Sequence, residues 1–486
     1  MEAVKINNSS IFSSSIILIS IIALAIYFLS QYPEAWIIIV GIIIFWTSFF
    51  LMHILVGLNL FRITIPSFFW FLYLITIFFP AFYWFFKKPD PFRYTFLFSV
   101  ESVLITIPLG ILLANILFFF KKSEIKSYFE IPTQQKKPLH IRYLLIYITV
   151  LFVAIGFMLS YIAEVKTIPL FYMFAHPGES MILAQLRDVS FKVLDSPFRF
   201  AYHLLRDFLY PVLIMFAFGC YLYSRQRKWL SLFLGTLAIG LLYASFTLAR
   251  LPPAAIFFLI FLFLYLFYGG KPNKIITLFL LFLFLVFPIV VLLFSQTGAS
   301  VIYAVKTTFE RIFLAPANIL YYYYEIIPDR IDFLYGATMG KLAYFFGQEY
   351  FNIGNFVSRY INPSSKIETG SANVAFIGEL YANFGIFGVL FGGIITGIIM
   401  QAINIYLIRR RKTIFNISVF AFLLYEFGLL TILPLTSVLI FSGVPILLFL
   451  LLFSPRGYKK PIQAKTNRVI FRNDYLKEYA KKDFSY

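Results

Sequence analysis

The sequence predicts an all-α membrane protein that crosses the bilayer roughly twelve times. Of the 486 residues, 61% are hydrophobic and only 13% are charged. A soluble domain cannot bury that much apolar surface, because even a large one leaves much of its chain in water. Many apolar stretches reach about 18 residues, which is enough to span the hydrocarbon layer as a helix. The short alternating segments of a membrane β-barrel are absent from the sequence.

Apolar runs place the spans, and charged or turn-forming residues separate them. The first run follows a weak basic flank at Lys5 and has no small-residue cleavage site, so we expect a retained helix and not a signal peptide. The predicted spans are 11–30, 35–59, 63–86, 94–120, 143–163, 207–224, 229–248, 253–269, 275–295, 374–408, 413–432 and 434–454.

The net charge of +19 has two readings, nucleic-acid binding and the positive-inside bias of membrane proteins. The basic residues gather in short segments between spans and in the tail, which favours the second reading and no nucleic-acid partner. With about twelve spans these segments share one side, which is then the cytoplasm. We therefore expect a multi-pass protein of the inner (cytoplasmic) membrane with both termini in the cytoplasm. The segments carry Lys121, Lys122, Lys126, Lys136, Lys137, Arg142, Arg225, Arg227, Lys228, Lys271, Lys274, Arg409, Arg410, Arg411 and Lys412.

The domain organisation follows from these spans. We expect one integral membrane domain, 1–486, with long outward loops at 164–206 and 296–373 and a basic cytoplasmic tail at 455–486. The second loop balances its charges and is rich in aromatic residues, which predicts a partly helical, folded cap. Within it, apolar residues between Val301 and Phe313 recur at helical spacing, and Ala315-Pro316 is expected to end that amphipathic helix.

Several chemistries are excluded by missing signatures. No glycine loop suited to cradling phosphate is present, which argues against ATP-driven transport. The four histidines lack metal-ligand spacing, so we expect neither a metal nor another cofactor. The single cysteine, Cys220, excludes a disulfide within the chain. The first outward turn also lacks the paired acidic motif of metal-dependent membrane glycosyltransferases.

Arginines on the outer side are the leading candidates for substrate binding. Arg250 lies in a tight turn between two spans, where a charge so close to hydrocarbon is costly. It is either a phosphate clamp, because guanidinium binds phosphate oxygens bidentately, or a snorkelling interface residue. Arg187 is a further candidate that could instead pair only with Asp188. The second loop adds Arg311, Arg330 and Arg359.

Two residues are candidate catalytic bases. Glu379 is the one acidic residue in its apolar helix, and it serves either as a base for a sugar hydroxyl or as the partner of an arginine. His176, in the first long loop, is either a surface residue or a base beside the arginines.

The chain resembles the bacterial O-antigen polymerases, the Wzy-type family of oligosaccharide repeat-unit polymerases. The likeness rests on the topology, on Phe333-Leu334-Tyr335-Gly336 and on the segment Ile377-Gly378-Glu379-Leu380-Tyr381-Ala382-Asn383-Phe384-Gly385. Arg359 also precedes Gly370 with an arginine–glycine spacing described for outward loops of some members, whereas the first long loop lacks that spacing. Tyr381, inside the matching segment, is a candidate substrate contact.

The resemblance implies a fold like that of the lipid-donor (GT-C-like) membrane glycosyltransferases, and a metal-independent reaction. The donor would be an undecaprenyl-diphosphate-linked oligosaccharide, held in the membrane lipid, and the acceptor a second lipid-linked repeat unit. Arg250, Arg187 and Arg359 would hold the diphosphate, and Glu379 or His176 would be the base. The alternatives are a ligase of the O-antigen type and a flippase or exporter of lipid-linked sugar. A chain-length-regulating co-polymerase is an open further partner.

Overall fold

The computed structural model describes residues 34–59, 62–133, 141–192, 196–295, 300–363 and 371–452. Across these residues all regular structure is helical, and ten helices are long and apolar enough to cross a membrane. A further apolar helix, α13, is slightly shorter than those ten. The predicted all-α polytopic membrane class is therefore confirmed. The first predicted span, 11–30, and the predicted tail, 455–486, lie outside the described residues.

Each predicted span from residue 35 onwards corresponds to helix in the structure. Short helices fill the two predicted outward loops. The elements are α2 Ala35–Val56, α3 Ile65–Tyr73, η1 Leu74–Phe78, α4 Phe79–Lys87, α5 Arg93–Leu117, α6 Ser123–Glu130, α7 Ile141–Glu164, α8 Pro169–Ala175, α9 Ser180–Lys192, α10 Ser196–Leu204, η2 Leu205–Leu209, α11 Tyr210–Ser224, α12 Arg227–Ser245, α13 Leu251–Phe267, α14 Lys274–Ser295, α15 Val301–Phe309, η3 Glu310–Leu314, α16 Ala315–Ile326, η4 Gly340–Phe346, α17 Ile353–Ile361, α18 Phe376–Ile408, α19 Ile414–Gly428, η5 Leu429–Thr431, α20 Leu435–Leu439 and α21 Val444–Leu452.

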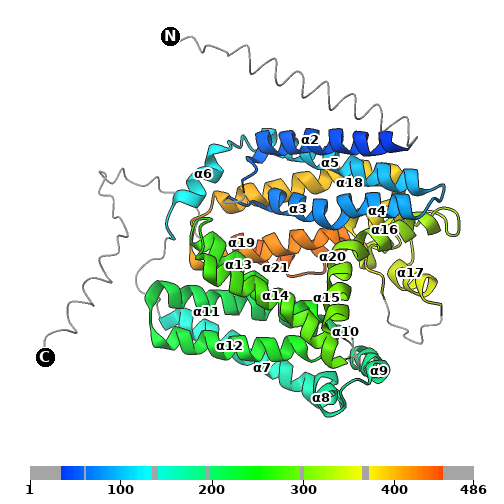
Figure 1. Cartoon of the computed structure of the whole chain (residues 1–486). Coiled ribbons are helices and arrows are strands. Elements are labelled where there is room, and N and C mark those ends of the chain that lie inside the picture. The colour runs from blue at the N-terminus through cyan, green and yellow to red at the C-terminus, as the bar shows by residue number, and fades with distance from the viewer. Residues whose placement is uncertain are drawn as a thin grey trace, which may run out of the picture.

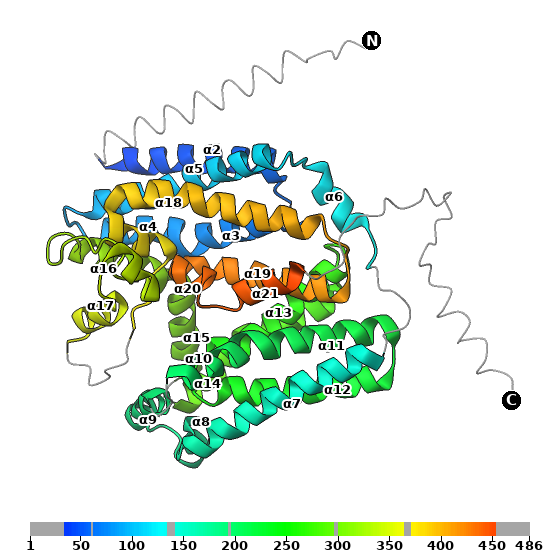
Figure 2. The ribbon, with the colours of Figure 1, turned by 180° about the vertical axis from the view of Figure 1, so that it is seen from behind.

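The long helices run side by side in layers (Figure 1). One side of the bundle is formed by α2, α5 and α18, and the opposite side by α7, α11 and α12, with α3, α13 and α19 between them (Figure 2). The central α19 is almost wholly buried, whereas most side chains of α2, α7 and α14 are partly or fully exposed. In both views α15 runs across the end of the bundle, where α8, α9, α16 and α17 also lie.

Glycines allow α5 and α18 to pack at backbone contact. A Cβ built on Gly110 would lie 2.1 Å from the Ile394 carbonyl oxygen, and one built on Gly397 would lie 2.4 Å from the Ile107 carbonyl oxygen. No side chain fits at either position without moving backbone. Small residues at such positions are the usual way in which membrane helices approach closely. This contact fixes α18, which carries the family-like segment, against the rest of the bundle.

Three π-helical turns, η1, η2 and η3, interrupt otherwise continuous helices. Each is followed by a proline at the second position of the next helix, namely Pro80, Pro211 and Pro316. Proline lacks the N–H group for the helical hydrogen bond, and its ring clashes with the carbonyl four residues earlier, so the preceding turn widens. The prediction that Ala315-Pro316 ends its helix is therefore wrong, because η3 carries the chain on into α16.

Two other predicted span boundaries differ from those in the structure. The apolar helix that was expected to begin at 207 begins at Phe198, so the first outward loop is shorter than 164–206. The span predicted at 434–454 consists of α20 and α21, with a break at Ile440–Gly443. The chain between α19 and α20 turns at Pro434 and contacts the first turn of α18.

Charge is distributed unequally between the two ends of the bundle. The end that contains α6 carries most of the basic loop residues, and its acidic residues among those described are Glu124 and Glu130. Arg409 pairs with Glu124 at 2.8 Å and donates to the Phe118 carbonyl, and Lys122 donates to the His53 carbonyl. Cations thus satisfy carbonyl groups at helix C-termini. The basic residues of this end are Arg62, Lys121, Lys122, Lys126, Arg225, Arg227, Lys228, Lys271, Lys274, Arg409, Arg410, Arg411 and Lys412.

Candidate functional site

Three of the predicted arginines come together at the end of the bundle opposite α6. Arg187 lies on α9, Arg250 directly precedes α13, and Arg311 lies in η3. Burial, followed by the positive charges of Arg311 and Arg187, lowers the pKa of Arg250 to about 10. Arg187 is exposed at the surface, but the neighbouring chain removes part of its hydration. This desolvation, followed by the positive charges of Arg311 and Arg206, lowers the pKa of Arg187. We call Arg187, Arg250 and Arg311 the arginine cluster.

The arginine cluster is a strongly positive site. Among the residues whose side chains are described, no carboxylate lies within salt-bridge distance of its three members; Glu310, next to Arg311, approaches Lys306 instead, at 3.9 Å. The side chain of Asp188, the predicted alternative partner of Arg187, lies outside the described part of the structure. A pKa near 10 still leaves Arg250 charged at neutral pH. Like charges held together repel one another unless an anion lies between them. Guanidinium groups bind phosphate oxygens in a planar, bidentate manner, so the cluster suits a phosphate-containing anion.

Arg206, which was not among the predicted site residues, extends this site into the bundle. It is buried in η2, where its guanidinium pairs with both carboxylate oxygens of Asp207 at 2.7 Å and donates to Thr247. Its Nη2 is 3.1 Å from His203 Nδ1. Because arginine only donates, Nδ1 is the acceptor, which puts the proton of a neutral His203 on Nε2. The sequence signal for this residue is the Arg206-Asp207 pair within an apolar run.

The buried tyrosines beside Arg206 form a second unpredicted feature. Their rings stack or meet edge to face, with 4.5 Å between the ring centres of Tyr161 and Tyr202 and 4.9 Å between those of Tyr202 and Tyr243. The hydroxyl groups of Tyr210 and Tyr243 are buried without a hydrogen-bond partner in the described part of the chain. Buried hydroxyl groups normally bind a partner or an ordered water, so this region suits bound water.

The other two predicted arginines do not join the cluster. Arg330 places its guanidinium 4.8 Å from the centre of the Tyr360 ring, and the Tyr360 hydroxyl donates to Glu325 at 2.7 Å. Arg359 is exposed on α17, which lies beside α16 and apart from α9 in both views (Figures 1 and 2). The expectation that Arg359 meets Arg250 and Arg187 therefore does not match the placement of α17.

Glu379 lies in the first turn of α18 and is 2% exposed. One carboxylate oxygen accepts a hydrogen bond from the Thr436 backbone N–H at 3.1 Å, and the other accepts from the Thr436 hydroxyl. Among the described residues its hydrogen bonds thus come from the first turn of α20 and not from an arginine. Two roles were predicted for Glu379, a base and the partner of an arginine. In the described part of the chain no arginine pairs with it.

The two stretches that carry the family resemblance contact each other directly. The backbone N–H groups of Leu334 and Tyr335 donate to the carbonyls of Ala382 and Asn383 at 2.9 and 3.0 Å. The Asn383 side chain accepts from the Gly336 N–H at 2.8 Å and donates to the Glu379 carbonyl at 2.7 Å. Gly385 then takes a φ of 63° inside α18, a left-handed conformation that favours glycine, and kinks the helix.

Tyr381 and His176 each make contacts of their own within the protein. Tyr381 is 4% exposed, its ring stacks on Tyr324 at 3.8 Å, and its hydroxyl donates to the Ile327 carbonyl at 3.2 Å. These contacts occupy both its ring and its hydroxyl within the protein. His176 is exposed after α8 and stacks on Tyr172, whose hydroxyl donates to Glu179 at 2.6 Å. Their predicted roles in substrate contact and catalysis stay predictions.

The helical stretch formed by η3 and α16 begins with Arg311 of the arginine cluster and reaches the cavity that contains Glu379. Arg311 in η3 and Tyr323 in α16, which lines the same cavity as Glu379, are twelve positions apart. At about 1.5 Å of rise per residue this corresponds to roughly 18 Å along the helix. This value is the rise of the backbone between these two residues. The role of Glu379 as a base stays a prediction.

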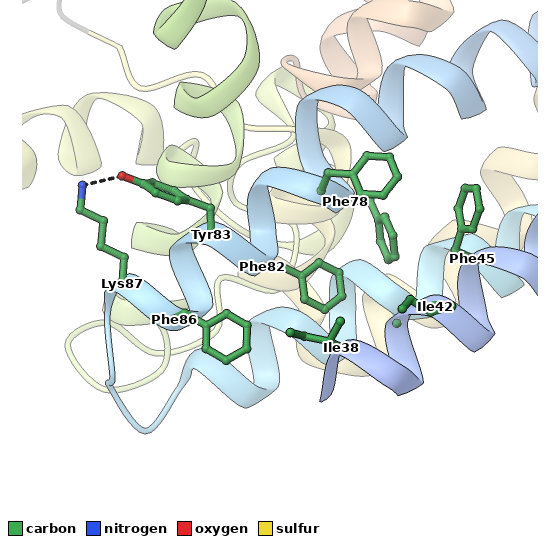
Figure 3. A pocket seen from close by; sticks show the side chains of 10 residues that line it. Ile38, Ile42, Phe45, Phe78, Phe82, Tyr83, Phe86 and Lys87 are labelled. Carbon is green, nitrogen blue, oxygen red and sulfur yellow. Dashed lines mark hydrogen bonds between the residues drawn. The ribbon is translucent and has the colours of Figure 1, made fainter. Parts of the chain in front are cut away.

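A groove of about 670 Å³ opens between α2 and the η1–α4 stretch (Figure 3). Its lining is apolar except at the end where Lys87 donates a hydrogen bond to the Tyr83 hydroxyl at 3.0 Å. Such a lining suits hydrocarbon and not sugar or phosphate. None of the predicted site residues is among those that line it, which are Ile38, Gly41, Ile42, Phe45, Phe78, Phe79, Phe82, Tyr83, Phe86 and Lys87.

Comparison of the chain with protein-family models, with curated proteins and with solved structures finds no match.

Proposed function

We propose that this protein is a metal-independent glycosyltransferase that polymerises lipid-diphosphate-linked oligosaccharide repeat units at the outer face of the cytoplasmic membrane. In this proposal the end of the bundle that carries α6 faces the cytoplasm, in keeping with its basic loops. The arginine cluster then lies at the outer face. The proposal extends to a GT-C-like fold and to a donor carried on undecaprenyl diphosphate, as the family resemblance implies.

The observation that carries the proposal is the arginine cluster itself. Three guanidinium groups from separate parts of the chain gather at one end of a membrane bundle without a carboxylate partner among the described residues. Holding like charges together is unfavourable, so a structure that does so is best explained by an anionic ligand. A diphosphate on a membrane lipid presents its charge at this level of the bilayer, where helix ends meet the head groups.

The proposed chemistry makes direct use of these charges. The acceptor hydroxyl oxygen forms a bond to the anomeric carbon of the donor sugar, and the bond from that carbon to the diphosphate breaks. The diphosphate leaves with the electron pair, and the hydroxyl proton passes to a base. Fixed cations aimed at the leaving group lower the barrier, because negative charge develops there in the transition state. Glu379 and His176 stay the predicted candidates for that base.

The test replaces Arg187, Arg250 or Arg311 with alanine and Lys306 with alanine as a matched control. Lys306 is an exposed cation on the neighbouring α15 and pairs only loosely with Glu310. Cells that depend on each variant are analysed for surface polysaccharide by gel and for lipid-linked sugar by mass spectrometry. We expect each arginine variant to lose long chains and accumulate lipid-linked single repeat units, with transfer slowed about 100-fold, whereas K306A makes normal chains.

Other outcomes assign the protein differently. Normal chain lengths in all three arginine variants would overturn the proposal. If removing the protein leaves long chains on the lipid carrier but none on the final acceptor, the protein is a ligase. If single repeat units accumulate only on the cytoplasmic leaflet, it moves lipid-linked sugar across the membrane.

Purified protein should also bind pyrophosphate, and this binding should raise the midpoint of its thermal unfolding. The R250A variant should lose that rise, whereas the K306A variant should keep it.

A further inference from the structure

A small polar cavity surrounds Glu379, away from the arginine cluster. It measures about 160 Å³ and is enclosed by α16, Thr338, the start of α17 with the residues before it, the first turn of α18 with the residues before it, and the start of α20. Most of its lining side chains carry hydroxyl, amide or carboxylate groups, unlike the apolar groove beside α2. The residues that line it are Tyr323, Thr338, Tyr350, Phe351, Asn352, Ile353, Gly354, Ser371, Ala372, Asn373, Val374, Glu379, Pro434, Thr436 and Ser437.

The carboxylate in this cavity is held in a fixed position. Both of its oxygens accept hydrogen bonds from Thr436, and the Leu435 backbone N–H is a further donor to the carboxylate. Asn383 in turn holds the Glu379 carbonyl and the Gly336 and Thr338 backbone, so the wall behind the carboxylate is also fixed. A buried carboxylate that is oriented in this way is a directed acceptor for hydroxyl donors.

Aromatic rings complete two walls of the cavity. Tyr323 is almost fully buried and is held by a hydrogen bond of 3.0 Å from its hydroxyl to the Ala372 carbonyl. Tyr350 is 53% exposed and therefore stands where the cavity opens to the surface. Rings with an apolar face and a polar edge suit a ligand that is itself apolar on its ring faces and polar at its rim.

The chemistry of the lining selects one class of ligand. The carboxylate repels anions such as phosphate. Among the described residues, no group of three or more His, Cys, Asp or Glu side chains that could hold a metal ion occurs here or elsewhere. The amides and hydroxyl groups would be poorly satisfied by an apolar chain. A neutral ring that carries several hydroxyl groups, small enough for the cavity, is a single sugar.

We infer that the cavity around Glu379 is a binding subsite for one sugar ring of the oligosaccharide substrate. The inference rests on the proposed function for its substrate. Tyr323, which lines the cavity, lies about 18 Å from Arg311 along the helix, so the cavity and the arginine cluster can contact different parts of one oligosaccharide. Glu379 thereby acts as a specificity residue that recognises one ring of the repeat unit.

The test uses purified full-length protein in detergent and saturation-transfer NMR. The probes are methyl glycosides of the monosaccharides released by hydrolysing the surface polysaccharide of the host cell. The variants Tyr350→Ala and Asn373→Leu alter the mouth and lining of the cavity. Tyr344→Ala is the matched control, because Tyr344 is another exposed tyrosine on the same segment and does not line the cavity.

We expect one glycoside to bind the wild type and Y344A, and to bind Y350A and N373L about tenfold more weakly. Glu379→Gln should weaken the same glycoside, whereas pyrophosphate binding stays unchanged in all four variants. Absence of glycoside binding by a wild type that binds pyrophosphate, or equal binding by Y350A, N373L and Y344A, would overturn the inference and leave the proposed function standing. Glycoside binding without pyrophosphate binding would leave the subsite and remove the proposed function.

Discussion

At the scale of single residues, Asn383 joins two parts of the chain that are 47 positions apart. Its amide oxygen accepts from the Gly336 N–H at 2.8 Å and its amide nitrogen donates to Thr338 and to the Glu379 carbonyl at 2.6 and 2.7 Å. The side chain is completely buried, so none of these bonds competes with water. A segment that looks like a sequence motif is therefore also a structural clamp that positions Glu379.

Replacing Asn383 with alanine should destabilise the protein strongly. The change leaves the buried Gly336 N–H without a side-chain acceptor, which costs about 1–3 kcal/mol for one unsatisfied group. Thermal unfolding of purified protein in detergent, followed by tyrosine and tryptophan fluorescence, measures the loss. Asn362→Ala, an exposed amide after α17, serves as the control and should leave the midpoint unchanged. Equal midpoints for N383A and N362A would show that the hydrogen bonds of Asn383 contribute nothing.

At the scale of elements, the sequence predicts the helices better than their interruptions. Hydrophobic runs indicate each described span, because a helix in hydrocarbon needs both length and apolarity. The π turns before Pro80, Pro211 and Pro316 were not predicted, since a proline can end a helix, kink it or widen one turn. Which of these occurs depends on packing: the η3 turn continues into α16 because α16 packs on α4 and α18. Two of the three turns carry arginines of the site region, Arg206 and Arg311.

The contact of α5 with α18 gives a prediction at this scale. Gly110→Ala should lower the free energy of unfolding by about 1–3 kcal/mol, the usual effect of overpacking, because the new methyl group would overlap the Ile394 carbonyl. Gly156→Ala in α7 is the control, since a Cβ there has no neighbour within 4 Å. Helix propensity alone should make G156A neutral or about 1 kcal/mol more stable. Thermal unfolding in detergent measures both, and a G110A midpoint at or above that of G156A would contradict the close contact.

At the scale of the whole molecule, the bundle has two chemically different ends. One carries basic loops that cap helix C-termini, and the other carries the arginine cluster, the Glu379 cavity and the crossing helix α15. In the proposed orientation, which follows the positive-inside rule, the site lies at the outer face. A lipid-linked substrate would reach this end from the membrane, whereas its sugars would extend among the short helices α16 and α17 above the bundle.

The orientation can be tested with introduced cysteines. The native Cys220 is fully buried, so it should not react with a membrane-impermeant maleimide in intact cells. Asp329→Cys lies at the end with the cavity and Lys271→Cys lies at the basic end, and both positions are exposed. We expect D329C to be labelled in intact cells and K271C only after the membrane is opened. The reverse pattern would place the arginine cluster in the cytoplasm and remove the proposed reaction at the outer face.

The sequence by itself determined three properties: that this is a membrane protein, the positions of its spans, and which of its loops are basic. These properties depend on the composition of about twenty neighbouring residues, because a helix of that length spans the hydrocarbon layer. Only the tertiary structure decided that Arg187, Arg250 and Arg311 come together while Arg330 and Arg359 do not, and that Glu379 binds Thr436 and not an arginine. Such meetings depend on how helices far apart in the chain pack and where prolines widen a turn, and no local pattern of residues specifies either.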